Sequence, residues 1–136
     1  MENCIFCNII NAVKIQAFCD EFPKERIVYQ DDTWLAIYDN YPVSQGHVLL
    51  IPKRHVDTFF GLNMVEFGSL GVTIGIIKMI LDKKYHPTGY NIGANCGKSA
   101  GQTVMHCHIH IIPRYDGDMA DPRGGVRGVI PEKQKY

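Results

Sequence analysis

The stretch that decides the fold runs from Val104 to Tyr115 and reads VMHCHIHIIPRY. It carries three of the six histidines of the chain at alternate positions: His106, His108 and His110. Successive side chains of a β-strand point to opposite faces, so a strand here would gather the three imidazoles on one face. The residues on the other face, packed on a core, would be Cys107, Ile109 and Ile111. We therefore predict a strand whose histidine face borders a site or solvent.

One straight strand cannot bring all three histidines to a single metal ion. At a rise of about 3.3 Å per residue, the Cα atoms of His106 and His110 lie roughly 13 Å apart, whereas zinc binds imidazole nitrogens at about 2.0–2.1 Å. At least one histidine therefore has another role. Neutral imidazole is a nucleophile as well as a base, so one histidine could attack phosphorus while its neighbours donate hydrogen bonds to phosphate oxygens. The alternative is a solvated strand face that happens to hold three histidines.

The remaining elements predict an α+β fold with an antiparallel sheet, because strands precede and follow one long helix. We predict a short helix over residues 4–12, strands over 26–30, 34–39, 47–52, 90–96 and 104–114, and the long helix over 62–85. Its apolar stripe consists of Leu70, Ile74, Ile77 and Leu81. Three glycines weaken this helix, and close packing on the sheet could explain them: Gly68, Gly71 and Gly75.

We find no internal repeat and no linker, so we expect a single domain over residues 1–136. About 115–136 would form a loop-like C-terminal tail of that domain. Within this tail Arg123 or Arg127 could reach a site, even across a dimer, and bind distal phosphates. Alternatively, the tail simply folds over the surface.

Composition limits the classes of function. The 136 residues are 46% apolar and 21% charged, as in soluble globular proteins. Fourteen basic residues balance 14 acidic ones, which argues against a nucleic-acid partner but not against a single nucleotide. The N-terminus lacks the pattern of a signal peptide, and no run approaches 18 uncharged apolar residues, so we expect a cytoplasmic protein without a membrane partner. The five cysteines are then reduced thiols or metal ligands.

Three segments together resemble the histidine triad (HIT) family, whose signature is His-x-His-x-His followed by apolar residues. These segments are GQTVMHCHIHIIPR (101–114), LAIYDNYPVSQGHVLLIPKRH (35–55) and NCIFCNII (3–10). The resemblance spans Asn3 to Arg114. It implies a five-stranded antiparallel sheet with one long and one short helix, and a homodimer in which the two sheets run together.

The resemblance also implies a substrate, a nucleotide that carries a phosphoanhydride or phosphoramidate bond. His108 would attack the α-phosphorus and form a nucleotidyl-histidine intermediate that water then breaks. His110 would bind phosphate oxygens, and its presence favours a hydrolase over a related branch that has glutamine there. The other implied site residues are Asp39 for the ribose hydroxyls, Gln102 and Thr103 for the phosphate chain, and His47 and Asn95 in the same pocket, with His47 grouped among the catalytic residues. Ile5, Phe6 and Ile37 could cover a purine base.

Cys4 and Cys7 form a Cys-x-x-Cys motif. A redox pair is one interpretation, although no strand–helix unit of a thioredoxin motif follows, and two inert buried cysteines are another. HIT members with this N-terminal pair commonly bind zinc, and by position the further ligands would be His55 and His106. Two thiolates and two imidazoles make a closed, tetrahedral structural site. Cys19, Cys96 and Cys107 would be core or surface thiols.

Several functions stay open. The residues IIPR (111–114) resemble family members that cleave dinucleoside polyphosphates, such as diadenosine tetraphosphate, more than those that cleave nucleoside phosphoramidates. The same site residues would also suit a non-catalytic module that binds a purine nucleotide and signals through a partner. The cysteine pair alone would suit a zinc-dependent redox or metal-store protein.

Overall fold

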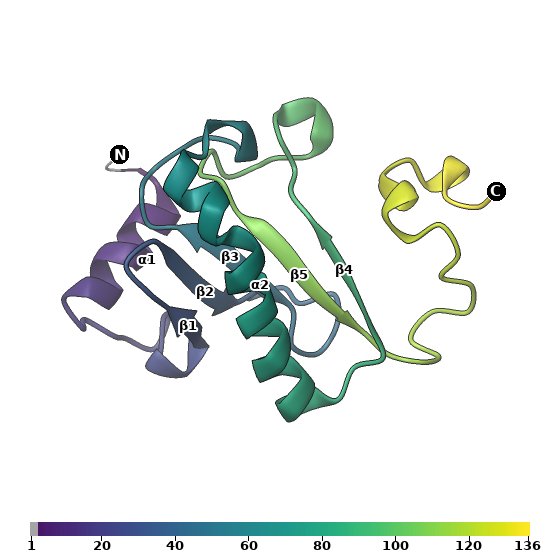
Figure 1. The fold of residues 1–136 in the computed structure, drawn as a ribbon, viewed down its shortest axis with the longest axis horizontal. Coiled ribbons are helices and arrows are strands. Elements are labelled where there is room, and N and C mark those ends of the chain that lie inside the picture. The colour runs from purple at the N-terminus through teal and green to yellow at the C-terminus, as the bar shows by residue number, and fades with distance from the viewer. Residues whose placement is uncertain (1–2) are drawn as a thin grey trace.

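The computed structural model describes residues 3–136 and, within them, one five-stranded antiparallel sheet (Figure 1). Its strands are β1 (Ile27–Gln30), β2 (Trp34–Tyr38), β3 (Val48–Pro52), β4 (Gly89–Gly93) and β5 (Ile109–Arg114), in the spatial order β1-β2-β3-β5-β4. The two α-helices are α1 (Ile5–Lys14) and α2 (Met64–Tyr85). Short 3-10 helices cover Lys24–Arg26, Phe59–Gly61, Lys98–Ala100, Gly125–Val129 and Pro131–Lys133. The predicted α+β fold with an antiparallel sheet is confirmed.

The two helices cover opposite faces of the sheet. The core beneath α2 contains alternate residues of the strands, including Trp34, Ala36, Val48, Leu50, Ile109 and Ile111. The core beneath α1 contains the intervening residues Leu35, Ile37, Leu49 and Ile51. Because β2 and β3 are buried on both faces, their sequences are continuously apolar rather than alternating. Among the described residues, the α1 core includes none from β4 or β5, which leaves that half of the face to the histidines.

Helix α2 begins with a capping box. The Asn63 side chain accepts from the backbone N–H of Glu66, and the Glu66 carboxylate accepts from the backbone N–H of Asn63. Arg54 donates to the same carboxylate at 2.7 Å, which ties the segment after β3 to the helix and lowers the pKa of Glu66 against the effect of burial. The helix ends at His86 in a left-handed conformation with φ 54°.

The three glycines of α2 do not pack on the sheet, so that expectation was wrong. In the described part of the chain, nothing lies within 4 Å of a Cβ built on Gly68, Gly71 or Gly75. They face outward with Val72 and Met79, which are 69% and 73% exposed. Helix α2 is long and apolar enough to cross a bilayer, judged by length and composition alone. That is weak evidence for a span, since the core helix of a soluble protein meets the same criteria.

The strand of the histidine motif is shorter than predicted. β5 begins at Ile109 instead of residue 104, and β4 ends at Gly93 instead of residue 96. Before Ile109 the chain leaves the ladder, because the backbone N–H of Cys107 donates to Val56 and the His106 ring bonds to the Pro52 carbonyl. The first two histidines of the triad therefore lie outside the sheet, and their rings bond to the backbone carbonyls of Pro52 and His106.

The tail beyond β5 contains regular structure, whereas the sequence predicts a loop. It forms two short 3-10 helices, Gly125–Val129 and Pro131–Lys133, which lie beyond β4 at the opposite end of the molecule from α1 (Figure 1). Arg114 starts this segment with paired hydrogen bonds of 2.8 Å to Asp118. The bonds turn the chain back toward β4 and β5.

Candidate functional site

The triad histidines lie on the α1 side of the sheet, as the alternation predicts. Phe6 of α1 makes edge contacts with the rings of His106 and His108, at centroid distances of 5.8 and 5.1 Å. The His108 and His110 rings lie 5.3 Å apart. The residues that alternate with the triad histidines, Cys107, Ile109 and Ile111, are buried in the core beneath α2.

The four predicted metal ligands converge at the start of α1. The ligand atoms of Cys4, Cys7, His55 and His106 all lie within 4.8 Å of one another. Cys4 is the N-cap of α1 and Cys7 lies in its first turn, so the helix N-terminus presents both sulfurs on one side. Burial and the neighbouring Cys4 sulfur raise the pKa of the Cys7 thiol in the chain without metal.

The spacing of these atoms fits a tetrahedral zinc site. A zinc ion bound to two sulfurs and two nitrogens places neighbouring ligand atoms roughly 3.3–3.8 Å apart. The Nδ1 atoms of His55 and His106 are 3.1 Å apart, and the Nδ1 atom of His106 lies 3.4 and 3.5 Å from the two sulfurs. The Cys7 sulfur lies 3.2 Å from Nδ1 of His55. The donor set and its dimensions therefore match a structural zinc site with little rearrangement.

Outer partners orient both histidines of this cluster. Nε2 of His106 donates to the Pro52 carbonyl at 2.9 Å, which leaves its Nδ1 lone pair free for a metal. Nε2 of His55 lies 3.3 Å from a carboxylate oxygen of Asp57. Ligand histidines commonly have such partners. The sequence analysis missed both, and only Asp57, two residues after His55, gave a sequence signal.

The tautomer of the neutral His108 ring follows from one hydrogen bond. Its Nδ1 lies 2.9 Å from the backbone carbonyl of His106. A carbonyl only accepts, so Nδ1 carries the proton and Nε2 of the neutral ring keeps its lone pair. His108 is half-buried between Phe6 and His110. This tautomer is the one that a nucleophile acting through Nε2 requires.

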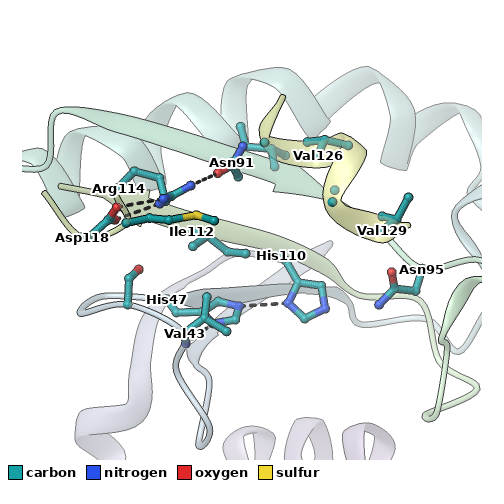
Figure 2. Close-up of a pocket in the computed structure, with 17 residues that line it drawn as sticks. Val43, His47, Asn91, Asn95, His110, Ile112, Arg114, Asp118, Val126 and Val129 are labelled. Carbon is teal, nitrogen blue, oxygen red and sulfur yellow. Dashed lines mark hydrogen bonds and ion pairs between the residues drawn. The ribbon is translucent and has the colours of Figure 1, made fainter. Parts of the chain in front are cut away.

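His47 and His110 form a second hydrogen-bonded unit beside it (Figure 2). The backbone N–H of Val43 donates to Nδ1 of His47, so Nε2 of His47 carries the proton and donates to Nδ1 of His110 at 2.9 Å. Nε2 of His110 is then the protonated atom. Burial lowers the pKa of His47, and burial together with the neighbouring His108 and His47 lowers that of His110 to about 4. Both rings are therefore neutral near pH 7, and Nε2 of His110 can donate to an oxygen.

The remaining predicted residues divide into two groups. Asp39 lies 3.5 Å from Nε2 of His47 through one carboxylate oxygen, and Asn95 lines the same cavity as His47 and His110. Gln102 is 3% exposed, and its side chain accepts from Gly97 and donates to two backbone carbonyls, those of Asp57 and Val104. Its amide thus fixes the loop before the triad and is not free for a phosphate. Thr103 is exposed on that loop.

Of the residues suggested to cover a base, Phe6 contacts the triad histidines, whereas Ile37 has no surface open to a ligand. Ile37 is fully buried in the core beneath α1, so that suggestion was wrong for it. Ile5 is 56% exposed at the start of α1. The alternation of β2 explains the difference, because Ile37 points toward α1 from within the sheet.

A cavity of about 680 Å³ lies beside His47 and His110, over β4 and β5. His47, His110 and Asn95 lie on one side of it, and Val126 and Val129 of the C-terminal segment face them (Figure 2). The sequence analysis did not assign these valines. Arg123 and Arg127 do not line the cavity: Arg123 pairs with Asp121, and Arg127 donates to backbone carbonyls near the C-terminus.

Comparison with known proteins connects this geometry to a family. The HIT domain family model matches residues 21–117. An uncharacterised HIT-like protein of Methanocaldococcus jannaschii is 41% identical over 116 residues, which cover 85% of this chain and 81% of the relative. An adenylylsulfatase of Arabidopsis thaliana is 34% identical over 117 residues, which cover 86% of this chain and 55% of that protein.

Two solved structures are also similar. A HIT family protein of Bacillus anthracis has a TM-score of 0.73 at 37% identity and covers 85% of this chain and 76% of its own. A zinc-bound histidine triad family protein of Mycobacterium smegmatis has a TM-score of 0.72 at 30% identity and covers 88% of this chain and 81% of its own. Both identity values are high enough that the similarity extends beyond the fold.

Proposed function

The chain belongs to the histidine triad (HIT) family, and on that premise we propose that it hydrolyses nucleotides at the α-phosphate through His108. The observation that carries the proposal is the hydrogen bond from Nδ1 of His108 to the His106 carbonyl. In the neutral ring this bond puts the proton on Nδ1 and leaves the Nε2 lone pair as the nucleophile. Family members as a group are nucleotide-binding hydrolases or transferases, and the site fits that class.

The chemistry proceeds in two displacements. The Nε2 lone pair of His108 forms a bond to the α-phosphorus, and the bond from phosphorus to the leaving group breaks with its electron pair on the leaving group. Water then attacks the same phosphorus, the N–P bond breaks, and the nucleoside monophosphate and free His108 result. Nε2–H of His110 donates to a phosphate oxygen as charge builds up on it. Asp39 would accept hydrogen bonds from the ribose hydroxyls.

We propose that zinc holds the framework rather than taking part in the reaction. Cys4, Cys7, His55 and His106 would hold it as a structural ion. His106 connects the two sites, because its ring faces the metal cluster while its carbonyl orients His108. The zinc-bound relative from Mycobacterium smegmatis supports this assignment.

Two substrate classes suit the proposed reaction, dinucleoside polyphosphates and nucleoside phosphoramidates. The residues IIPR after the triad favour the first on the resemblance alone. The Arabidopsis relative, an adenylylsulfatase, supports an adenylyl group on the nucleotide side of the scissile bond. We further propose that the protein acts in the cytoplasm.

A non-catalytic nucleotide-binding module is the second candidate, because it would need the same residues. Turnover separates the two. The variant His108→Asn should release nucleoside monophosphate at least about 10³-fold more slowly than the wild type, since it removes the nucleophile. His86→Asn is a matched control, because His86 is exposed at the end of α2 and asparagine tolerates its left-handed backbone. If wild type and His108→Asn are equally slow on both substrate classes, the hydrolase proposal fails.

We also propose a homodimer formed along β4 and α2. β4 is an edge strand of the sheet, and Ile92 on it is 45% exposed. The outward stripe of α2 consists of Val65, Gly68, Val72, Gly75 and Met79, at spacings of three and four residues. Small residues on such a stripe allow two helices to approach closely. Together these features support a second copy that extends the sheet and covers the outer face of α2.

A further inference from the structure

The cavity beside His110 has a largely apolar lining, and the two charged side chains in it neutralise each other. The charged side chains among its lining residues are Arg114 and Asp118. They bind each other through two hydrogen bonds of 2.8 Å, and Arg114 also donates to Asn91 at 2.7 Å (Figure 2). No unpaired cation therefore faces the cavity from these residues.

Aliphatic side chains supply much of the remaining wall. Ile92 and Ile112 line it from β4 and β5, and Val126 and Val129 from the C-terminal segment. The two valines are 61% and 76% exposed. Exposed aliphatic residues that gather around a hollow next to polar catalytic groups are typical of a ligand subsite.

His110 connects the cavity to the proposed nucleophile, because its ring lies 5.3 Å from that of His108 and also lines the cavity. The ring of Phe6 on α1 lies 5.1 Å from that of His108. His110 and His47 border the cavity, whereas Phe6 does not. A nucleoside held against α1 would therefore direct the group beyond the α-phosphorus past His110 and into the cavity.

We propose that this cavity is the leaving-group subsite, that it takes an uncharged apolar group, and that Val126 and Val129 determine this specificity. The proposal rests on the proposed hydrolase function. A polyphosphate chain carries several negative charges and is bound in proteins by Arg and Lys side chains. Among the described residues that line the cavity, the one cationic side chain is Arg114, which Asp118 already neutralises. The structure thus favours a small apolar leaving group over the second nucleotide of a dinucleoside polyphosphate.

The test compares two substrates with the same scissile bond. Both are adenosine 5′-phosphoramidates; one leaving amine is an uncharged aromatic amine and the other is the same amine with two added carboxylates. In each, the P–N bond breaks and the amine takes up a proton, so only the leaving group differs. We expect wild-type kcat/KM to favour the uncharged amine by at least about tenfold.

Lysine substitutions should shift this preference. Val126→Lys and Val129→Lys each place a cation on the wall and should lower the ratio of the two kcat/KM values by about tenfold or more. Ile130→Lys is the matched control, because Ile130 is 56% exposed in the same segment but does not line the cavity. Its ratio should equal that of the wild type.

Other outcomes overturn the proposal in distinguishable ways. A wild type that cleaves both amides equally, or prefers the charged one, excludes an apolar subsite. Valine variants that keep the wild-type ratio but change the oligomeric state show that a second copy of the chain fills the cavity. If neither amide is cleaved and His108→Asn behaves as wild type, the hydrolase function itself fails, and the subsite with it.

Discussion

The Nδ1 atom of His108 lies 2.9 Å from the carbonyl oxygen of His106, two residues earlier in the chain. That carbonyl is available because β5 begins only at Ile109, so the backbone of His106 is outside the strand ladder. The ring of the same residue bonds to Pro52 and faces the cysteine pair. One histidine thus joins the metal cluster to the proposed nucleophile, and its position fixes which nitrogen of His108 is unprotonated.

We predict opposite tautomers within the triad. His108 should be protonated at Nδ1, whereas His106 and His110 should be protonated at Nε2, because their Nδ1 atoms face the metal cluster and the His47 donor respectively. Nitrogen-15 NMR of labelled imidazoles at pH 7.5 distinguishes the two forms. A pyridine-like Nδ1 in His108 would contradict the assignment.

Zinc should copurify with the protein at about one equivalent per chain. Replacing Cys7 by Ser should reduce the content below about a tenth of an equivalent and lower the Tm by roughly 10 °C, since structural zinc stabilises the folded state. Cys19→Ser should change neither quantity, because Cys19 is exposed and lies outside the cluster. Wild-type protein that never met a chelator and still contains less than a tenth of an equivalent of any metal would refute the site.

Acid should destabilise the protein partly through His110. Burial holds its pKa at about 4 in the folded chain, below the value of about 6.5 in an unfolded chain. Between these values the unfolded state binds more protons, so the free energy of unfolding falls as pH drops from 6.5 toward 4. In His110→Gln, which keeps an acceptor for His47, the loss between pH 6.5 and 4.5 should be roughly 2 kcal/mol smaller. Denaturant titrations of both proteins measure this; identical pH dependence would show that His110 titrates normally.

The outward face of α2 should control the oligomeric state. Val72→Lys places a charge in the middle of the stripe and should convert a dimer into monomers, as measured by light scattering coupled to size-exclusion chromatography. Ile15→Lys, at an equally apolar position that is 63% exposed after α1, should leave the dimer intact. A wild type that is still monomeric at 100 times the protein concentration used in the turnover measurements would exclude the dimer.

Much of the fold was predictable because the hydrophobic pattern of the sequence agrees with the burial of the side chains in the structure. The alternation around His106–Ile111 and the apolar stripe of α2 both describe surfaces that pack on each other. The start of β5 was not predictable, because it depends on a ring bond from His106 to Pro52 and a backbone bond from Cys107 to Val56, and both partners are distant in sequence. The glycines of α2 misled because small residues occur on exposed helix faces as well as on closely packed ones.

The sequence predicted those site residues that belong to recognisable motifs. It did not predict the contacts that depend on how distant segments pack together. The cluster Cys4, Cys7, His55 and His106 assembles as the resemblance implies. The side-chain amide of Gln102 instead bonds to the loop, which no spacing reveals. Val126 and Val129 gave no sequence signal, because an exposed valine in a tail is ordinary until the fold places it opposite His110.

Acid-quenching a single turnover and mapping the modified peptide by mass spectrometry tests the central claim most directly. The account predicts a nucleotidyl group on the peptide that carries His108, present in wild type within the first turnover and absent in His108→Asn. A nucleotidyl group on His110 or His47, or turnover with no covalent intermediate at any quench time, would contradict it.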